Sequence, residues 1–308
     1  MRVAVTGGTG FVGRHTIALL RGRGHGVRAL ARTPAGSRLL TALGAEPIPG
    51  HLAQPSALTA LLDGADAAVH LVAIIVESGP ATFAAVHVEG TRRLLDAAHA
   101  ARLRQLVYMS AIGARPDARA TRYHRTRWEA EELVRSSGLN AAILQPSLIV
   151  GPENVPVRTL ARVHRWSPVV PVFGDGRFPM QPVWVEDVAL AVALAVERPD
   201  VCGTFELGGP EIVTFERFVR AIGRATGHPR PLIHVPLRVA RRLARLCDPL
   251  GRHAPITSEQ LQMLVEGSAT PQNAIEAVFG IRPLGLEAAL EKATRSKEGP
   301  GWQDTSLV

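Results

Sequence analysis

The stretch Arg2-Val3-Ala4-Val5-Thr6-Gly7-Gly8-Thr9-Gly10-Phe11-Val12-Gly13 decides the fold of this 308-residue chain. Its first apolar residues are typical of a buried strand, and residues 11–23 have the spacing of an amphipathic helix. Gly7 permits a tight turn, Gly10 leaves room for a ligand beside the backbone, and Gly13 lets the helix pack closely on the strand. The helix N-terminus would face a diphosphate. We therefore expect dinucleotide contacts from Gly7, Thr9, Gly10, Phe11, Val12 and Gly13.

The same alternation of strand and helix continues outward from this stretch and predicts an α/β protein with a doubly wound parallel sheet of the Rossmann type. The expected strands cover 27–31, 67–72, 106–109, 141–150 and 204–207, and the expected helices cover 56–63, 81–101, 121–137 and a segment ending near 197. Residues 1–150 plus about 184–207 would form the dinucleotide-binding domain. Residues 151–183, expected as loops, would join the largely helical 208–293 in a smaller C-terminal substrate lobe, and 294–308 would be a disordered tail.

Composition narrows the class of protein further. The chain is 46% hydrophobic and 20% charged, has no run of 18 apolar residues, and opens without a signal peptide, so a cytoplasmic protein is expected. Cys202 and Cys247 lack the spacing of metal ligands, and no metal is predicted. The net charge of +8 is dispersed along the chain, so nucleic-acid binding is not predicted. Two interpretations of the positive charge stay open. The arginines could be solvated surface residues, or they could attract the protein to acidic lipid or another polyanion.

The end of the second expected strand bears on which nicotinamide dinucleotide binds. An NAD(H) site usually has a carboxylate there that binds the ribose hydroxyls, but this strand ends in Arg32-Thr33. Arg32, aided by Thr33 and Arg38, could pair with a 2′-phosphate. NADP(H) is therefore favoured over NAD(H). The alternative is that Arg32 is only a solvated surface arginine.

Several motifs in order along the chain carry a resemblance to a known superfamily. They are Thr6–Gly13, Ala67–Ala73, Val86–Ala97, Val107–Ala114, Tyr123–Glu132, Gln145–Pro152, Pro182–Ala189 and Phe205–Pro210. With this set, the chain resembles the extended and atypical branch of the short-chain dehydrogenase/reductase superfamily, within the NAD-dependent epimerase/dehydratase family. It is similar to the NDUFA-nine-type accessory subunit group of respiratory complex I.

The resemblance implies catalysis by a serine, a tyrosine and a lysine four residues after the tyrosine. Here Tyr123 has Arg127 at that position, and this exchange is not conservative. The serine would be Ser110, although the family position falls nearer Ile112. His87 stands where the family has an asparagine, and His51 where it has an aspartate near the adenine. The remaining cofactor contacts implied by the resemblance are Leu52, Leu71, Val72, Ala73, Tyr123, Arg127, Pro146, Ser147 and Leu148.

Some of these residues also have simpler readings. Tyr123 could contact ribose without doing chemistry, the Ser147 hydroxyl could cap the backbone, and Glu129 and Glu131 would be solvated helix charges. The segment 236–250 combines one apolar helical face, expected at Leu237, Ala240, Leu243, Ala244, Cys247 and Leu250, with several arginines. It could dock on the core, or it could attach the protein to an anionic membrane or a respiratory complex.

Two functions follow as hypotheses. The first is an NADP(H)-dependent oxidoreductase or epimerase-type enzyme that acts on a small organic substrate, quinone- or isoprenoid-like, with Tyr123 as acid/base and Arg127 as ribose anchor. The second is a non-catalytic dinucleotide-binding accessory, assembly or sensor protein. Either could be a monomer or a homodimer.

Overall fold

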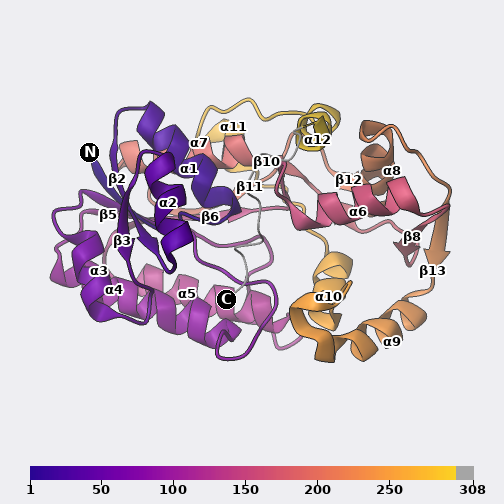
Figure 1. The fold of residues 1–308 in the computed structure, drawn as a ribbon, viewed down its shortest axis with the longest axis horizontal. Coiled ribbons are helices and arrows are strands. Elements are labelled where there is room, and N and C mark those ends of the chain that lie inside the picture. The colour runs from indigo at the N-terminus through magenta and orange to yellow at the C-terminus, as the bar shows by residue number, and fades with distance from the viewer. Residues whose placement is uncertain (296–308) are drawn as a thin grey trace. The chain divides into compact units, whose positions relative to one another are not determined.

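The computed structural model describes residues 1–295, and the chain divides into two compact units (Figure 1). The first unit consists of Met1–Gln145 and Val188–Glu206. The second consists of Pro146–Asp187 and the described residues from Leu207 onward. Thr294 and Arg295, expected to begin a disordered tail, are the last residues of a helix. The rest of the expected tail, 296–308, lies outside the described residues.

The first unit is built on a seven-stranded sheet in the order β11-β6-β5-β4-β1-β2-β3. Neighbouring strands from β3 to β6 run parallel; Val3, for example, pairs with Val27 of β2 and Ala67 of β4. This order confirms the predicted doubly wound fold. The strands are β1 Arg2–Thr6, β2 Gly26–Ala31, β3 Glu46–Pro49, β4 Ala67–His70, β5 Gln105–Met109, β6 Asn140–Pro146 and β11 Gly203–Leu207.

Helices cover both faces of this sheet (Figure 1). On one face, α3, α4 and α5 bury a core that includes Leu58, Leu94 and Val134 against the strands. On the other face lie α1, α2 and α7. The helical segments of this unit are α1 Phe11–Gly22, α2 Pro34–Ala42, α3 Pro55–Leu62, the π-helix η1 Ala84–Glu89, α4 Gly90–Ala100, α5 Arg122–Ser136 and α7 Val185–Glu197, whose first residues belong to the second unit.

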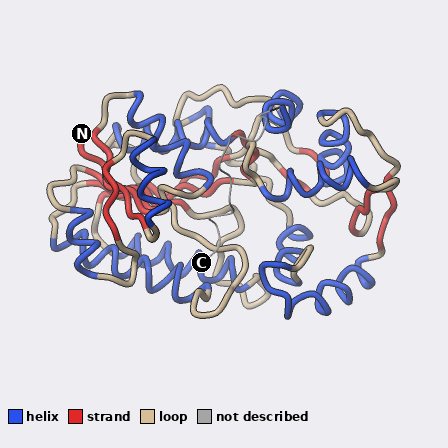
Figure 2. Tube along the Cα trace, viewed as in Figure 1, coloured by secondary structure: helices blue, strands red, loops and turns tan. Residues whose placement is uncertain are grey.

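The second unit is mainly helical (Figure 2). Its helices are α6 Val155–Trp166, α8 Phe215–Ala225, α9 Leu237–Cys247, the 3₁₀ turn η2 Asp248–His253, α10 Ser258–Glu266, α11 Ala274–Ala277 and α12 Leu286–Arg295. Its strands pair in twos: β7 Ile149–Val150 with β10 Val183–Trp184, β9 Pro179–Met180 with β12 Val213–Thr214, and β8 Val170–Phe173 with β13 Leu232–Val235. Among the described residues, no helix is long and apolar enough to cross a membrane.

The structure corrects several predicted elements. Residues 151–183 are not only loops, because Asn154 accepts a hydrogen bond from the Val157 amide at 2.8 Å and caps α6. The single helix expected over 81–101 is a π-helix followed by an α-helix. The strand expected over 141–150 is two strands, β6 ending at Pro146 and β7 starting at Ile149. Helix α2 and strand β3 were not predicted.

Candidate functional site

The glycine loop between β1 and α1 forms a tight cradle. Gly7 has a φ of +79°, and its carbonyl accepts a hydrogen bond from the Gly10 amide at 3.0 Å. A Cβ atom added at Gly13 would lie 2.2 Å from that same carbonyl oxygen. Helix α1 starts at Phe11 with no side-chain cap and no acidic residue in its first turn. Its first N–H groups are therefore left to an external acceptor, as a diphosphate requires.

The segment after β4 forms the neighbouring edge of this cradle. The Leu71 amide donates to the Thr6 carbonyl at 3.1 Å. A Cβ atom at Gly7 would lie 2.9 Å from the carbonyl carbon of Leu71. Val72 is half-buried and Ala73 exposed. The structure thus brings the 71–73 segment directly against the glycine loop.

An arginine and the N-terminus of helix α2 follow the end of β2. Arg32 is exposed, and the Thr33 hydroxyl oxygen accepts a hydrogen bond from the Gly36 amide at 3.1 Å, so it caps α2. Further along the same side of the sheet, His51 is exposed and its Nδ1 accepts from the Ala53 amide at 3.2 Å. Leu52 packs beside Gly90. Arg32 and Thr33 thus lie at a helix N-terminus, where an anion is stabilised.

Tyr123 and Arg127 lie one turn apart on α5, both buried against the sheet. The Tyr123 ring makes edge contacts with the rings of Phe83 and His87, at centroid distances of 5.9 and 5.5 Å. The Arg127 side chain is 1% exposed, and its Cζ lies 5.1 Å from the centroid of the Tyr108 ring on β5. Its Nε and Nη1 atoms are buried and have no hydrogen-bond partner among residues 1–295.

Ser110, which follows β5, is buried as well. Its amide donates to the Leu144 carbonyl at 2.6 Å, so its backbone continues the pairing with β6. Its hydroxyl, like the two Arg127 nitrogens, has no hydrogen-bond partner within the described part of the chain. Buried polar atoms without partners are rare in folded proteins, and a bound ligand with acceptor groups would explain those of Ser110 and Arg127.

Two buried histidines that were not predicted as site residues accompany Arg127. The His70 ring nitrogens are 2.5 Å from the Thr6 hydroxyl and 3.3 Å from the Thr91 hydroxyl. Burial lowers the pKa of His70 to about 3 and that of His87 to about 2, and repulsion by Arg127 adds to both shifts. Both rings are therefore neutral at physiological pH. A histidine at the end of an otherwise apolar strand is the sequence signal that could have identified His70.

The hydrogen bonds of His87 define its tautomer. Its Nε2 accepts from the Ile74 amide at 3.1 Å, so in the neutral ring the proton is on Nδ1. That Nδ1 donates to the Thr126 hydroxyl at 2.9 Å, and the hydroxyl donates in turn to a backbone carbonyl one turn earlier in α5. His87 therefore connects the segment after β4 to the helix that carries Tyr123.

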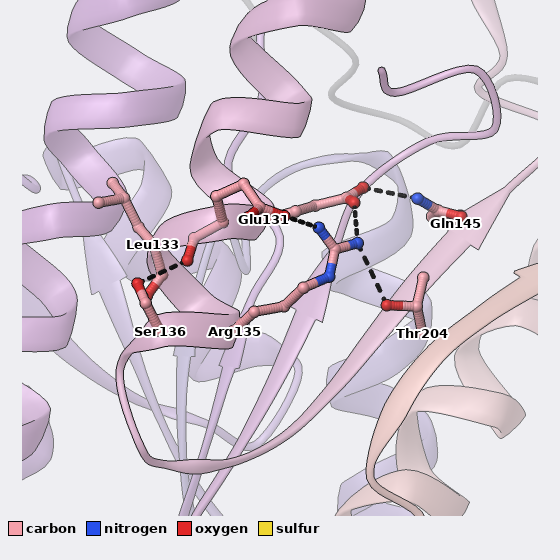
Figure 3. Close-up of polar contacts among 7 residues, drawn as sticks. Glu131, Leu133, Arg135, Ser136, Gln145 and Thr204 are labelled. Carbon is pink, nitrogen blue, oxygen red and sulfur yellow. Dashed lines mark hydrogen bonds and ion pairs between the residues drawn. The ribbon is translucent and has the colours of Figure 1, made fainter. Parts of the chain in front are cut away.

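A polar cluster fixes α5 one turn after Arg127 (Figure 3). Glu131 is buried, which corrects its interpretation as a solvated charge. Its carboxylate accepts from Gln145 Nε2 at 2.7 Å and from Arg135 Nη2 at 2.5 Å, and Arg135 also donates to the Thr204 hydroxyl at 3.3 Å. The Glu131 carboxylate thus joins α5 to β6, and Arg135 extends the cluster to β11.

Pro146, Ser147 and Leu148, expected beside the nicotinamide, belong to the second unit. The Ser147 amide donates to the Leu207 carbonyl at 2.8 Å, and its hydroxyl donates to the Ser268 carbonyl. The Ser147 hydroxyl therefore donates its proton within the second unit, in line with the interpretation of Ser147 as a residue that caps the backbone.

Comparison with known proteins agrees with this geometry. Residues 3–208 match the model of the NAD dependent epimerase/dehydratase family. The ceramide reductase of Caulobacter vibrioides is 31% identical over 237 residues, 76% of this chain and 73% of that protein. The mitochondrial NADH dehydrogenase (ubiquinone) 1 alpha subcomplex subunit 9 of Arabidopsis thaliana is 24% identical over 88% of this chain and 71% of that protein.

The fold has a close counterpart among solved structures. The UDP-glucose 4-epimerase of Thermus thermophilus, in complex with NAD, aligns with a TM-score of 0.72 over 96% of this chain and 100% of that one, at 22% identity. The cradle, the strand order and the family match agree with the sequence motifs. This chain belongs to the NAD dependent epimerase/dehydratase family, an NAD(P)-binding branch of the short-chain dehydrogenase/reductase superfamily.

Proposed function

We propose that this protein binds NADP(H) and reduces a carbonyl group on a small lipophilic molecule. The observation that carries the proposal is the buried Arg127 guanidinium, with two nitrogens that have no partner in residues 1–295. A buried donor without a partner costs about 1–3 kcal/mol, and a ligand that supplies an acceptor removes this cost. Ribose hydroxyls of a nicotinamide dinucleotide are acceptors that fit Arg127, because the tyrosine one turn earlier lies on the same face of α5.

Each residue of the proposed site has a separate role in the reaction. When bound, the dinucleotide supplies the hydride that reduces the carbonyl carbon. The Tyr123 hydroxyl donates its proton to the carbonyl oxygen as negative charge develops there, and solvent later returns that proton. Arg127 stabilises the tyrosinate by its charge and holds the ribose. Since Arg127 stays protonated throughout, it cannot itself relay the proton. Ser110, with a hydroxyl that has no partner in the described chain, orients the carbonyl.

The preference for NADP(H) rests on the end of β2. No carboxylate stands at this position, and Arg32 lies beside the N-terminus of α2. A 2′-phosphate would therefore meet an arginine and the first N–H groups of a helix. The exposed Arg38, on the same helix, adds a second cation.

The proposed substrate class is a long-chain, quinone- or isoprenoid-like carbonyl compound. The support is the relationship to two proteins, one named ceramide reductase and one named 4-hydroxy-2-methyl-3-oxo-4-farnesyl-3,4-dihydroquinoline-1-oxide ketoreductase, because the first name denotes a lipid and the second a ketone that carries a farnesyl group.

The proposal is tested by fluorescence titration with NADPH and NADH. We expect Arg32→Ala to weaken NADPH binding by about 10- to 100-fold, the loss of one charge-assisted contact, and to leave NADH affinity nearly unchanged. Arg93→Ala, an exposed arginine on α4, is the matched control and should bind both as the wild type does. A wild-type preference for NADH, or equal losses for both ligands in Arg32→Ala, would contradict the proposal.

A non-catalytic accessory role is the second candidate, and two observations favour it. An arginine replaces the family lysine after Tyr123, and a relative of the chain is named as a subunit of NADH dehydrogenase. Oxidation of NADPH with decylubiquinone or a long-chain ketone separates the two candidates. For an enzyme, Tyr123→Phe should keep NADPH affinity and lose turnover by at least about 100-fold. Cofactor binding without turnover across such a panel would favour the accessory role.

A further inference from the structure

Helix α9 of the second unit docks on its unit in an unusual way. Its buried residues are the small Ala240 and Ala244, which pack on a cluster that includes Leu261. Surface helices normally turn their large apolar residues toward the core. Leu243, expected on the apolar face of this helix, is 54% exposed. Leu237, at the start of α9, packs beside Gly174, but most of the other large apolar side chains of this helix are exposed.

The exposed apolar residues form a ridge. Val239, Leu243, Leu246 and Leu250 are between 46% and 77% exposed, and they recur every three or four residues, so they follow one side of α9 into the next turn. They are four of the ten exposed large apolar side chains in the described chain. A continuous apolar stripe on a water-exposed surface marks a contact with another apolar phase.

Four arginines lie beside this ridge. Arg238, Arg241, Arg242 and Arg245 are all exposed, and none of them makes an ion pair with a described residue. At about 100° per residue, they occupy the adjoining arc of the helix, next to Leu246. Helix α9 has no acidic residue, and Asp248 just after it is bonded to the Ser258 amide and hydroxyl at 2.8 and 2.7 Å.

We propose that α9 lies on an anionic lipid surface, with the apolar ridge among the acyl chains and the arginines at the phosphate level. Arginine side chains can lie along an apolar surface while their charged ends reach the headgroups. The ridge is aliphatic, and the four arginines beside it have no ion-pair partner among the described residues, which suits simultaneous contact with acyl chains and anionic headgroups. The combination therefore fits a fluid lipid layer better than a protein partner, and it does not depend on the function proposed for the first unit.

Flotation of the full chain with phosphatidylglycerol vesicles tests the proposal, with phosphatidylcholine vesicles for comparison. We expect binding to the anionic vesicles to exceed binding to the neutral ones by about 100-fold or more, and to weaken as salt is added. Leu243→Ser/Leu246→Ser should reduce binding by about 100-fold. Arg241→Gln/Arg242→Gln should reduce it by about 25-fold, at roughly fivefold for each arginine.

Matched controls carry the same chemistry elsewhere on the surface. Ile212→Ser removes an equally exposed apolar residue, and Arg93→Gln/Arg162→Gln removes two exposed arginines; both should bind as the wild type does. NADPH titration and thermal melting of every variant show that the chain is folded. Absence of wild-type binding to anionic vesicles would overturn the proposal. So would equal binding to neutral vesicles, or α9 variants that bind as well as the controls.

Discussion

Arg127 makes opposite contributions to stability and to binding. Its guanidinium is buried on the face of Tyr108, close enough to His70 and His87 to lower the pKa of both, and two of its nitrogens have no partner in the described chain. The contact with the Tyr108 ring is favourable, but in the ligand-free protein the two unpaired nitrogens and the burial of the charge are unfavourable, because an unpaired buried donor keeps its desolvation cost. A residue kept under these conditions is best explained by what it binds.

We therefore expect Arg127→Met to stabilise the ligand-free protein and to weaken its ligand binding. Methionine fills a similar length without charge, and the free energy of unfolding should rise by about 1–3 kcal/mol. NADPH affinity should fall by about 10-fold or more, because the ribose loses a charged donor. Urea unfolding without ligand and fluorescence titration with NADPH measure the two effects.

Arg135→Met is the matched control on the same helix. Arg135 is bonded to Glu131, so its loss leaves a buried carboxylate without its cation and should lower the unfolding free energy by about 1–3 kcal/mol. If Arg127→Met destabilised the ligand-free protein as Arg135→Met does, Arg127 would be a structural residue and not a ligand-binding one.

At the scale of elements, the junction of β1 and α1 depends on backbone contact. The distance of 2.2 Å between a Cβ at position 13 and the Gly7 carbonyl cannot be relieved by rotating a side chain. We expect Gly13→Ala to lower the unfolding free energy by about 1–3 kcal/mol and to remove most NADPH binding, since α1 must move away from the cradle. Gly22→Ala, in the same helix with open space around it, should instead stabilise by about 0.5–1 kcal/mol. Urea unfolding that showed equal effects for the two would contradict the close packing.

Elements with a local signature could be predicted, and the others could not. The β1–α1 unit is encoded within a few residues by its glycine spacing. Strand β3 reads Glu46-Pro47-Ile48-Pro49, and its two prolines are not typical of a strand. It pairs with β2 at the sheet edge and packs Ile48 against the core, and neither partner is close in the sequence. Helix α6 begins with Val155-Pro156 in a segment whose composition is typical of loops. Its start is marked by the N-cap residue Asn154.

The residues of the candidate site also divide into those that could be predicted from the sequence and those that could not. Tyr123 and Arg127 could be paired from the family resemblance together with their spacing, since four residues make one turn of helix. The roles of His70 and Glu131 could not, because their partners lie far away along the chain: Thr6 and Thr91 for the first, Gln145 for the second. A charged residue on a helix looks solvated until the strand that it faces is known.

At the scale of the whole molecule, the two buried histidines set the response to acid. Their pKa values are lowered from 6.5 to about 3 and about 2, so below pH 6.5 the unfolded chain binds protons that the folded chain does not. Stability is thus complete above about pH 7 and falls as the pH drops. The expected loss between about pH 7.5 and pH 5 is roughly 2 kcal/mol for each histidine.

Urea unfolding across this pH range measures the loss. His70→Gln should remove about half of the pH dependence that both histidines cause, while His99→Gln, at an exposed position, should leave it unchanged. Equal slopes for wild type and His70→Gln would show that His70 accepts protons in the folded state.

The path of the chain through its two units has a consequence for synthesis. The first unit is complete only when β11 and most of α7 have joined Met1–Gln145, and about 60 residues separate Gln145 from the end of this second segment. At about 5–20 residues per second, a ribosome needs roughly 3 to 12 seconds to produce them. Throughout this interval the free edge of β6 and the sheet face beneath α7 are uncovered on the nascent chain. Although the cradle is encoded near the start of the chain, it emerges attached to an unfinished sheet that a chaperone has time to bind.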